Sequence, residues 1–333
     1  MGVADIARSA EHRLARSQVR RKARAGWEPR ATGFTGYGSP ERARVMGRVL
    51  MKDPASAETG NERGWRQFIT AQVAHTPVTV ELGSQRIGTR TNDEGYFEVI
   101  ITGHGLEPGW HTARITLAIG GHQELAPVVI IPDTVTRGIV SDVDDTIMVT
   151  MLPRAALAAW NSWVKKTNTR KPVAGMAGFL RSLRGPEDPV FYLSTGAWNT
   201  YDTLTAFIRD HGYPRGPLLL TDWGPTPTGL FRSGPEHKRV RLRNLLIDFP
   251  HITWTLVGDD GQHDPMIYSD LVAEHPDRIE LVAIRELSSR EHVLAHGSTT
   301  AIEQPGNYHG VPALFGADGD DLARYWDELN RGA

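Results

Sequence analysis

The sequence contains no cysteine among its 333 residues, and this absence excludes several kinds of chemistry. Without cysteine the chain has no disulfide framework, no thiolate zinc site and no cysteine nucleophile. No stretch approaches the run of about 18 apolar residues that a membrane-spanning helix requires. Neither sign of charge is in excess, because 37 Lys and Arg face 39 Asp and Glu, for a net charge of -2. We therefore expect no nucleic-acid partner.

The rest of the composition is that of an ordinary globular protein, with 40% hydrophobic and 23% charged residues. At about 150 residues per domain, the length indicates two domains. The pattern along the chain predicts a basic N-terminal helix over residues 1–30, a small all-β domain over 34–132 and an α/β domain over 135–330.

Arginine and lysine crowd the first thirty residues, and several alanines make this segment a good helix former. No apolar run follows the basic residues, as one would in a signal peptide, so we expect a cytoplasmic protein. Two interpretations of the segment stay open. It is either a helix that lies on an anionic membrane surface, as a peripheral contact, or a solvated helix beside the body of the protein.

Short runs of alternating apolar and polar residues fill the region from residue 44 to about 132. The expected strands are Val45–Met51, Phe68–Val73, Val78–Leu82, Tyr96–Thr102, Thr112–Ile119 and Pro127–Ile131. Several short strands separated by glycine-containing turns predict a small antiparallel sandwich. Since no group of carboxylates or histidines here resembles a catalytic site, we expect a structural or substrate-presenting domain.

Beyond residue 136, apolar strands alternate with helices. The expected strands are Gly138–Ser141, Val190–Leu193, Leu218–Leu220, Trp254–Val257 and Ile279–Ile284. The expected helices are Gly178–Leu183, Thr200–Asp210, Glu236–Asp248 and Asp264–Glu274. This alternation predicts a parallel sheet that helices cover on both faces. In such sheets ligands bind beyond the carboxyl ends of the strands.

Polar side chains follow three of these strands at that edge. They are Asp142, Asp144 and Thr146 after the first strand, Ser194, Thr195 and Gly196 after the second, and Asp259, Asp260 and Asp264 after the fourth, with Lys238 on the preceding helix. Two carboxylates two residues apart suit phosphoryl transfer. Asp142 can attack phosphorus and form an aspartyl-phosphate, while Asp144 protonates the leaving oxygen and then activates water.

The remaining polar groups suit the charge of a phosphate monoester. Mg²⁺ prefers oxygen ligands, and Asp142 and Asp259 can supply two of them. Ser194 and the backbone N–H groups of Thr195 and Gly196 can donate to phosphoryl oxygens. Further candidates are Lys238 as a positive charge on the transferring group, Thr146 as a residue that orients the aspartate loop, and Arg285, which either grips the phosphate or pairs with Glu286.

Asp-x-Asp-x-Thr, a serine, a lysine and Gly-Asp-x-x-x-x-Asp occur here in an order that resembles the haloacid-dehalogenase superfamily of phosphatases. Residues 141–147, 192–199 and 258–265 look more narrowly like the catalytic domain of the actin-patch-protein phosphatidate phosphatases. These are Mg²⁺-dependent relatives of the lipins, which release phosphate from phosphatidate and leave diacylglycerol. The resemblance covers Val135–Leu287 and, more weakly, Phe34–Leu50, and it departs from the family pattern at residues 195–197 and 260.

The resemblance implies a Rossmann-like, haloacid-dehalogenase-like fold after the β-sandwich. It also implies that the backbone carbonyl of Asp144 binds Mg²⁺ and that Asp264 orients Lys238 or metal-bound water. Asp260 competes with Asp264 for the second acidic position of the metal site. Only a short insert separates Thr146 from Gly175, which leaves the site open to a bulky substrate.

Three functions stay open. The first hypothesis is a phosphatidate phosphatase, and the second is a phosphatase of soluble phosphate esters or phosphoproteins. The third is a phosphatidate-binding module without catalysis. The presence of both Asp142 and Asp144 favours the two enzymes, because relatives that only bind lack the nucleophile.

Overall fold

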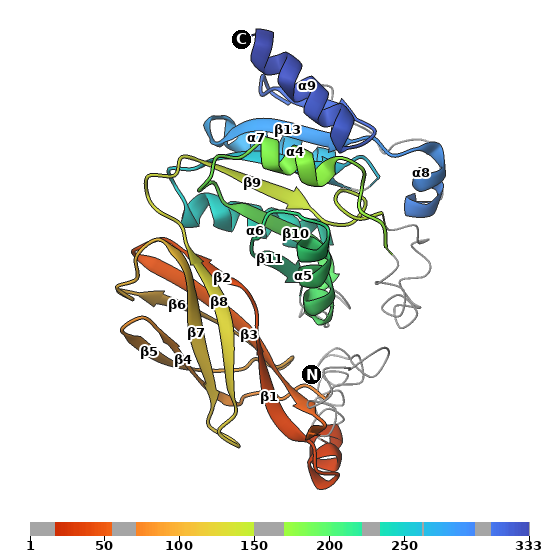
Figure 1. Cartoon of the computed structure of the whole chain (residues 1–333). Coiled ribbons are helices and arrows are strands. Elements are labelled where there is room, and N and C mark those ends of the chain that lie inside the picture. Colours follow the sequence, from red (N-terminus) through yellow and green to blue (C-terminus); the bar gives the residue numbers. More distant parts are fainter. Residues whose placement is uncertain are drawn as a thin grey trace, which may run out of the picture. The chain divides into compact units, whose positions relative to one another are not determined.

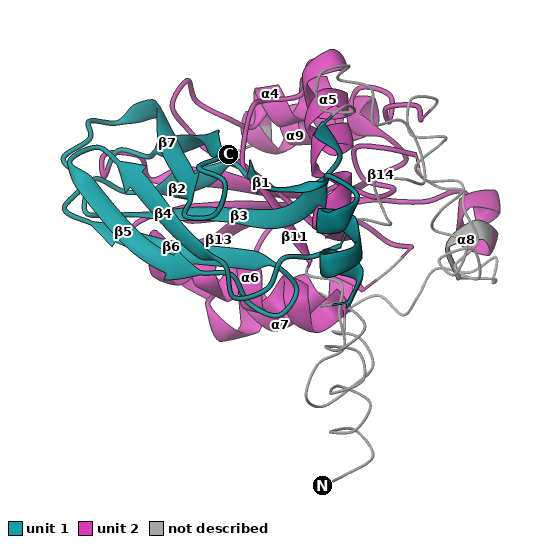
Figure 2. Cartoon of the chain, turned by 90° about the horizontal axis from the view of Figure 1, so that it is seen from below, with its two compact units in different colours: residues 1–132, 222–232 teal, residues 133–221, 233–333 magenta. Residues whose placement is uncertain are grey.

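The computed structural model describes residues 17–54, 71–149, 170–221, 234–261, 263–296 and 308–332. The chain forms two compact units, each with its own sheet (Figure 2). Unit 1 comprises residues 1–132 and 222–232, and unit 2 comprises residues 133–221 and 233–333.

Unit 1 is built on an eight-stranded, mostly antiparallel sheet. Its strands are β1 (Glu28–Gly33), β2 (Gly36–Gly38), β3 (Arg42–Lys52), β4 (Pro77–Leu82), β5 (Gln85–Arg90), β6 (Tyr96–Thr102), β7 (Gly109–Leu117) and β8 (Gln123–Ile130). They pair in the order β1-β3-β2-β8-β7-β4-β5, with β6 on β3, and β2 runs parallel to β8. The arrangement of these strands as a sandwich stays a prediction.

Burial alternates along the strands of unit 1, as in β6 and β8, and the buried positions share one hydrophobic core. Strands β1, β2 and β5 are additional to those predicted. β5 carries no fully buried residue and β2 has only three residues, so neither gives a clear apolar alternation. Residues 68–70 of the predicted second strand lie outside the described residues, while Gln72 forms a bridge with Leu50.

The basic N-terminal segment is helical over residues 17–24, and residues 1–16 lie outside the described part of the chain. The prediction of a helix to residue 30 is corrected, because β1 already begins at Glu28. The ammonium of Lys22 in this helix lies 3.8 Å from the ring centre of Trp27, which precedes β1.

Unit 2 contains a six-stranded sheet with helices between its strands (Figure 1). The strands are β9 (Arg137–Asp142), β10 (Val190–Ala197), β11 (Leu218–Thr221), β12 (Thr253–Asp259), β13 (Ile279–Arg285) and β14 (Ala313–Gly316). The helices are α4 (Met176–Ser182), α5 (Tyr201–Asp210), α6 (Gly234–Asp248), α7 (Asp264–Glu274), α8 (Ser289–His296) and α9 (Gly319–Gly332), with short 3-10 turns η4 (Trp198–Thr200) and η5 (Pro276–Arg278).

The strand order of this sheet is β11-β10-β9-β12-β13-β14, and every neighbouring pair is parallel. The prediction of a parallel sheet is therefore confirmed. The chain builds outward from β9 in one direction and from β12 in the other, so the winding reverses between these two strands. In open parallel sheets such a switch point, at the carboxyl ends, is where ligands bind.

After a half-buried first residue, every residue of β9 and of β12 is buried, which means that both faces of the sheet are covered. Strand β14 was not predicted, because it is a four-residue edge strand with only two buried positions. None of the helices in the described ranges is both long and apolar enough to cross a bilayer.

Candidate active site

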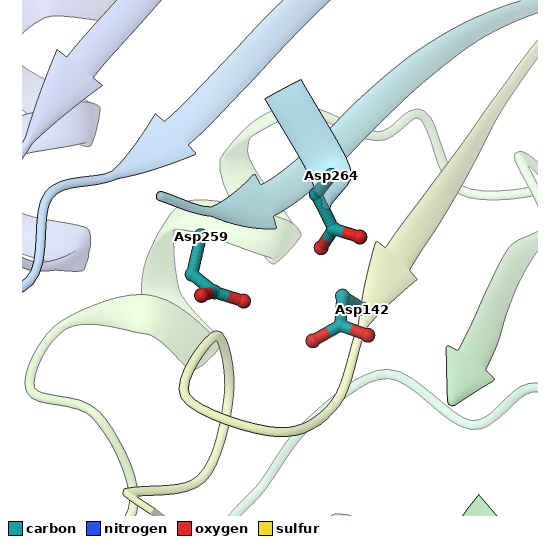
Figure 3. Close-up of side chains that lie close together, drawn as sticks. All are labelled: Asp142, Asp259 and Asp264. Carbon is teal, nitrogen blue, oxygen red and sulfur yellow. The ribbon is translucent and has the colours of Figure 1, made fainter. Parts of the chain in front are cut away.

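Three aspartate side chains from different elements meet at the carboxyl edge of the parallel sheet. Asp142 ends β9, Asp259 ends β12 and Asp264 begins α7. One carboxylate oxygen of each lies within 4.8 Å of the other two, and all three residues are buried (Figure 3). Because β9 and β12 are parallel neighbours, their last residues are brought together at the switch point.

A glycine in β12 makes room for the third carboxylate. A Cβ at Gly258 would lie 2.7 Å from Oδ2 of Asp264 and 2.8 Å from a ring carbon of Tyr268. The hydroxyl of Tyr268 donates to the carbonyl of Val257 over 3.0 Å, which ties α7 to β12. Pro265 in the first turn of α7 suits the start of a helix, and the helix dipole favours a carboxylate there.

Lys238 on α6 supplies the positive charge of this cluster. Its ammonium donates to Oδ1 of Asp142 over 2.6 Å and to Oδ1 of Asp264 over 2.5 Å. The side chains of Lys238, Asp142 and Asp264 are 4%, 3% and 0% exposed, so water screens these contacts little. The lysine thus holds two of the three carboxylates directly.

The charges of the cluster do not balance. Burial raises the pKa of Asp259 well above its usual value, and the nearby carboxylates of Asp264 and Asp142 raise it further. Burial also raises the pKa of Asp142, although Lys238 opposes the change. Burial alone would lower the pKa of Lys238, but its aspartate neighbours outweigh this effect and raise it. Three buried carboxylates therefore share one ammonium, and the cluster favours a further cation.

Asp144 lies beside the cluster and faces the end of β10. The hydroxyl of Ser194 donates to Oδ2 of Asp144 over 3.0 Å, and the backbone N–H of Gly196 donates to Oγ of Ser194 over 2.9 Å. The next residue, Thr195, is half-buried, and its carbonyl accepts a hydrogen bond from Thr221. The structure thus joins the first and second polar clusters of the sequence through the contact between Asp144 and Ser194.

Donors from the loops after β9 and β12 orient Asp259, and the contacts of Asp260 and Asp264 separate the roles of these two acids. The hydroxyl of Thr146 and the backbone N–H of Gly261 donate to the carboxylate of Asp259 over 3.4 and 2.8 Å. Oδ1 of Asp260 instead accepts the N–H of Leu287 over 2.8 Å. Of the two acids left open by the sequence, Asp264 therefore joins the three-carboxylate cluster and Asp260 lies in a contact with the next strand's loop.

Arg285 is placed differently from either sequence interpretation. Its guanidinium donates to the carbonyls of Asp145 and Ala317 over 2.7 and 3.1 Å, and to the carboxylate of Glu291 over 2.7 Å. Its ion-pair partner is Glu291 on α8, and not Glu286. Arg285 therefore stabilises the loop after β9, because its N–H groups donate to two backbone carbonyls and to a side chain of α8.

Two residues near the cluster were not among the site residues expected from the sequence. The guanidinium of Arg170 lies 3.7 Å from Oδ1 of Asp144, and Gly258 makes room for Asp264. Arg170 lies in the short insert predicted between Thr146 and Gly175, of which residues 150–169 lie outside the described chain. Neither an arginine in a polar stretch nor a glycine in a strand identifies its partner from the sequence.

Fold and site together define an α/β protein with a buried acidic cluster and a lysine at the switch point of a parallel sheet. Residues 137–286 match the family model of the phosphatidate phosphatase APP1 catalytic domain, so this segment is similar to that family. A phosphatidate phosphatase is a phosphoric monoester hydrolase. The matched segment contains all three aspartates and Lys238.

Two curated proteins show the same relationship. The phosphatidate phosphatase APP1 of Saccharomyces cerevisiae is 28% identical over 158 residues, which is 44% of this chain and 25% of the yeast protein. An uncharacterised protein of Schizosaccharomyces pombe is 22% identical over 152 residues, 45% of this chain and 25% of that protein. The match therefore spans about a quarter of the length of each relative.

Solved structures show only distant likenesses. A carbohydrate acetylesterase from Xanthomonas citri has a TM-score of 0.27 and 9% identity, with 90% of this chain and 73% of that chain covered. A sialyltransferase from Photobacterium damsela has a TM-score of 0.23 and 8% identity, with 76% and 42% covered. Likenesses of this size indicate neither a common fold nor a common function.

Proposed function

We propose that the chain is a Mg²⁺-dependent phosphatase of the haloacid-dehalogenase type that hydrolyses phosphatidate or a related phospholipid. One observation carries the proposal. The segment that matches the phosphatidate phosphatase family encloses the buried cluster of Asp142, Asp259, Asp264 and Lys238. The strand order of unit 2, which reverses at β9 and β12, supports a Rossmann-like fold for this segment.

The donor set fits a hard divalent cation. Three carboxylates offer oxygen ligands within 4.8 Å of one another, and Mg²⁺ prefers such ligands. Within the described residues, Oδ2 of Asp142 and Oδ2 of Asp264 are buried and accept no hydrogen bond. Asp142, Asp259 and the backbone carbonyl of Asp144 would hold the ion, with Asp264 beside them. When bound, Mg²⁺ would neutralise charge on the phosphoryl group and its attacking carboxylate.

Each side chain at this edge of the sheet then has its own role in the reaction. The carboxylate of Asp142 attacks phosphorus, and the bond from phosphorus to the leaving oxygen breaks as that oxygen takes a proton from Asp144. Water then attacks the aspartyl-phosphate, gives its proton to Asp144, and frees phosphate and the Asp142 carboxylate. Lys238 holds Asp142 in place throughout, and Ser194 orients Asp144.

A phospholipid is the substrate that the family favours, since the matched family and the yeast relative are named for phosphatidate. The lipid would be reached by a peripheral contact with an anionic membrane surface, to which the basic residues of helix 17–24 would contribute. The alternative substrates are soluble phosphate esters and phosphoproteins. A third alternative is a module that binds phosphatidate without hydrolysis.

A phosphate-release assay distinguishes these functions. Purified protein with Mg²⁺ is incubated with phosphatidate in mixed micelles, lysophosphatidate, a phosphoprotein and small phosphate esters. We expect release from phosphatidate, and loss of at least about 100-fold in rate for Asp142→Asn in a chain that still folds. The matched control is Asp277→Asn, at an exposed aspartate in η5, before β13 and hence at the other edge of the sheet.

Each other outcome points elsewhere. Release from soluble esters alone would contradict the lipid substrate. Binding of phosphatidate vesicles without release of phosphate would favour the binding module. Full activity of Asp142→Asn would require another nucleophile.

A further inference from the structure

The ends of the short insert after Thr146 are joined by a small antiparallel ladder. The N–H of Val149 donates to the carbonyl of Lys171, and the N–H of Val173 donates to the carbonyl of Ile147, both over 3.0 Å. Met148 and Pro172 form a bridge between these two pairs. This ladder fixes the backbone next to Arg170.

Arg170 directs its guanidinium from this ladder to the candidate proton donor. Nη1 lies 3.7 Å from Oδ1 of Asp144 and 3.6 Å from the sulfur of Met148, and the side chain is 7% exposed. Burial lowers the pKa of Arg170, yet a guanidinium starts from so high a value that it stays charged at neutral pH. A buried guanidinium is costly without a polar partner, and the carboxyl group of Asp144, which keeps an acceptor oxygen whether or not it carries a proton, is that partner.

Asp144 is consequently held from two sides. Oδ2 accepts a hydrogen bond from Ser194, and Oδ1 faces Arg170. Ser194 is itself fixed by the N–H of Gly196. A carboxyl group with both oxygens engaged has little freedom to rotate, and a proton donor is effective only when its oxygen is aimed at the leaving atom.

We propose that Arg170 is a positioning residue for the transfer of a proton from Asp144 to the leaving-group oxygen. The inference rests on the proposed function. As the bond from phosphorus to the leaving oxygen breaks, its electron pair remains on that oxygen, and the oxygen takes the proton from Asp144. Arg170 forms no bond to the substrate in this step. It acts through the orientation of Asp144, together with Ser194.

Such a role has a consequence that depends on the leaving group. An alkoxide leaves poorly without a proton, so hydrolysis of an alkyl phosphate or phosphatidate depends on Asp144 being aimed correctly. A nitrophenolate leaves readily without a proton. Loss of Arg170 should therefore slow hydrolysis of alkyl esters far more than hydrolysis of p-nitrophenyl phosphate. A residue that only stabilises the fold would slow both by the same factor.

The test compares Arg170→Gln and Arg170→Lys with the wild type on phosphatidate, glycerol phosphate and p-nitrophenyl phosphate. For Arg170→Gln we expect kcat/KM, which covers the steps through loss of the leaving group, to fall by about 10- to 100-fold on the two alkyl esters and by less than about threefold on the aryl ester. Arg170→Lys, which keeps the charge but loses the planar fork, should be intermediate. Inhibition by inorganic phosphate should not change. Arg209→Gln, at an arginine whose side chain is 73% exposed on α5, is the matched control.

The remaining outcomes overturn the inference. Equal losses on alkyl and aryl esters with weaker inhibition by phosphate would mean that Arg170 binds the phosphoryl group itself. Unchanged kinetics would make it a structural residue. If Arg170→Gln does not fold by thermal melting, the same comparison on Arg170→Lys decides. If the wild type hydrolyses none of the three esters, the proposed function itself is wrong. If the wild type is active and the variants are unaffected, only the role of Arg170 is wrong.

Discussion

Nη1 of Arg285 donates a hydrogen bond to the backbone carbonyl of Asp145 over 2.7 Å. Asp145 has a φ of 59°, in the left-handed region that costs a non-glycine residue about 1 kcal/mol or more. Its N–H is also engaged, by the carbonyl of Met148 over 2.8 Å. The loop that carries Asp142 and Asp144 is thus held in an unfavourable conformation, in part by an arginine from β13.

Replacement of this arginine should destabilise unit 2. Arg285→Met removes donors to Asp145, Ala317 and Glu291, and leaves the carboxylate of Glu291, which is 18% exposed, without its cation. We expect a loss of about 2–4 kcal/mol in the free energy of unfolding, because a largely buried charge and two carbonyls lose their partners. Urea unfolding followed by tryptophan fluorescence measures this change.

The control for this variant is Arg239→Met on α6, whose ion pair with Asp270 is more exposed, at 33% and 49%. A surface pair contributes less than about 1 kcal/mol, so this variant should unfold close to the wild type. Similar losses in the two variants would contradict the supporting role of Arg285.

The acidic cluster could be predicted from the sequence because its members lie at the ends of strong elements. β9 and β12 are nearly continuous runs of buried residues, and the expected helix Asp264–Glu274 agrees with α7 at both ends. Once these strands are parallel neighbours, their last residues must lie side by side, whatever the details of packing. The positions of Asp142 and Asp259 at the ends of these strands were thus enough to predict that the two side chains lie close together.

The supporting contacts could not be predicted in this way, because their partners are distant in sequence and come from loops. The sequence does not distinguish Asp260 from Asp264 as a member of the acidic cluster. The hydrogen bond from the N–H of Leu287 to Asp260 shows that Asp260 faces away from the cluster. The partner of Arg285 is Glu291 on α8, a helix that was not predicted. In unit 1, β5 lacked a signal because it is an edge strand without a fully buried side chain.

A second prediction concerns Gly258. In Gly258→Ala the new Cβ would lie within 2.9 Å of Asp264 and Tyr268, so the first turn of α7 has to move. We expect weaker binding of Mg²⁺ by about 10-fold and a matching loss of activity, because Asp264 leaves its place in the cluster. Isothermal titration with Mg²⁺ and the phosphate-release assay measure the two effects.

Gly178→Ala is the control for this change. Gly178 lies in α4, where a Cβ would meet no atom within 4 Å, and alanine is favoured over glycine in a helix by about 1 kcal/mol. This variant should be as stable as the wild type or more stable, with unchanged metal binding. Unchanged Mg²⁺ affinity in Gly258→Ala would show that Asp264 does not need its present position.

A third prediction removes the cation of the cluster. In Lys238→Met, Asp142 and Asp264 lose an ammonium at 2.6 and 2.5 Å while they stay buried. Loss of one partner of a buried ion pair costs about 3–5 kcal/mol, so the metal-free protein should be strongly destabilised at neutral pH. Added Mg²⁺ should recover more stability in Lys238→Met than in the wild type. An equal gain in stability from Mg²⁺ in the two proteins would mean that the metal does not bind these carboxylates.

The last prediction concerns pH. Burial raises the pKa values of Asp259 and Asp142 in the folded chain above their values in the unfolded chain. The folded state therefore binds these protons more tightly than the unfolded state does. Their ionisation costs stability as the pH rises from the usual carboxyl pKa, about 4, through the raised values. A divalent cation requires the ionised carboxylates, so protons and Mg²⁺ compete for the cluster.

Mg²⁺ should consequently raise the melting temperature more at pH 7.5 than at pH 5. At a concentration about 100 times its dissociation constant, a ligand adds about 2.7 kcal/mol, which corresponds to roughly 5–10 °C for a domain of this size. Differential scanning fluorimetry at matched ionic strength, with NaCl in place of MgCl₂ as the reference, measures the difference. Asp259→Asn should abolish it. An equal effect of Mg²⁺ at both pH values, or of NaCl, would mean that the ion does not bind these carboxylates.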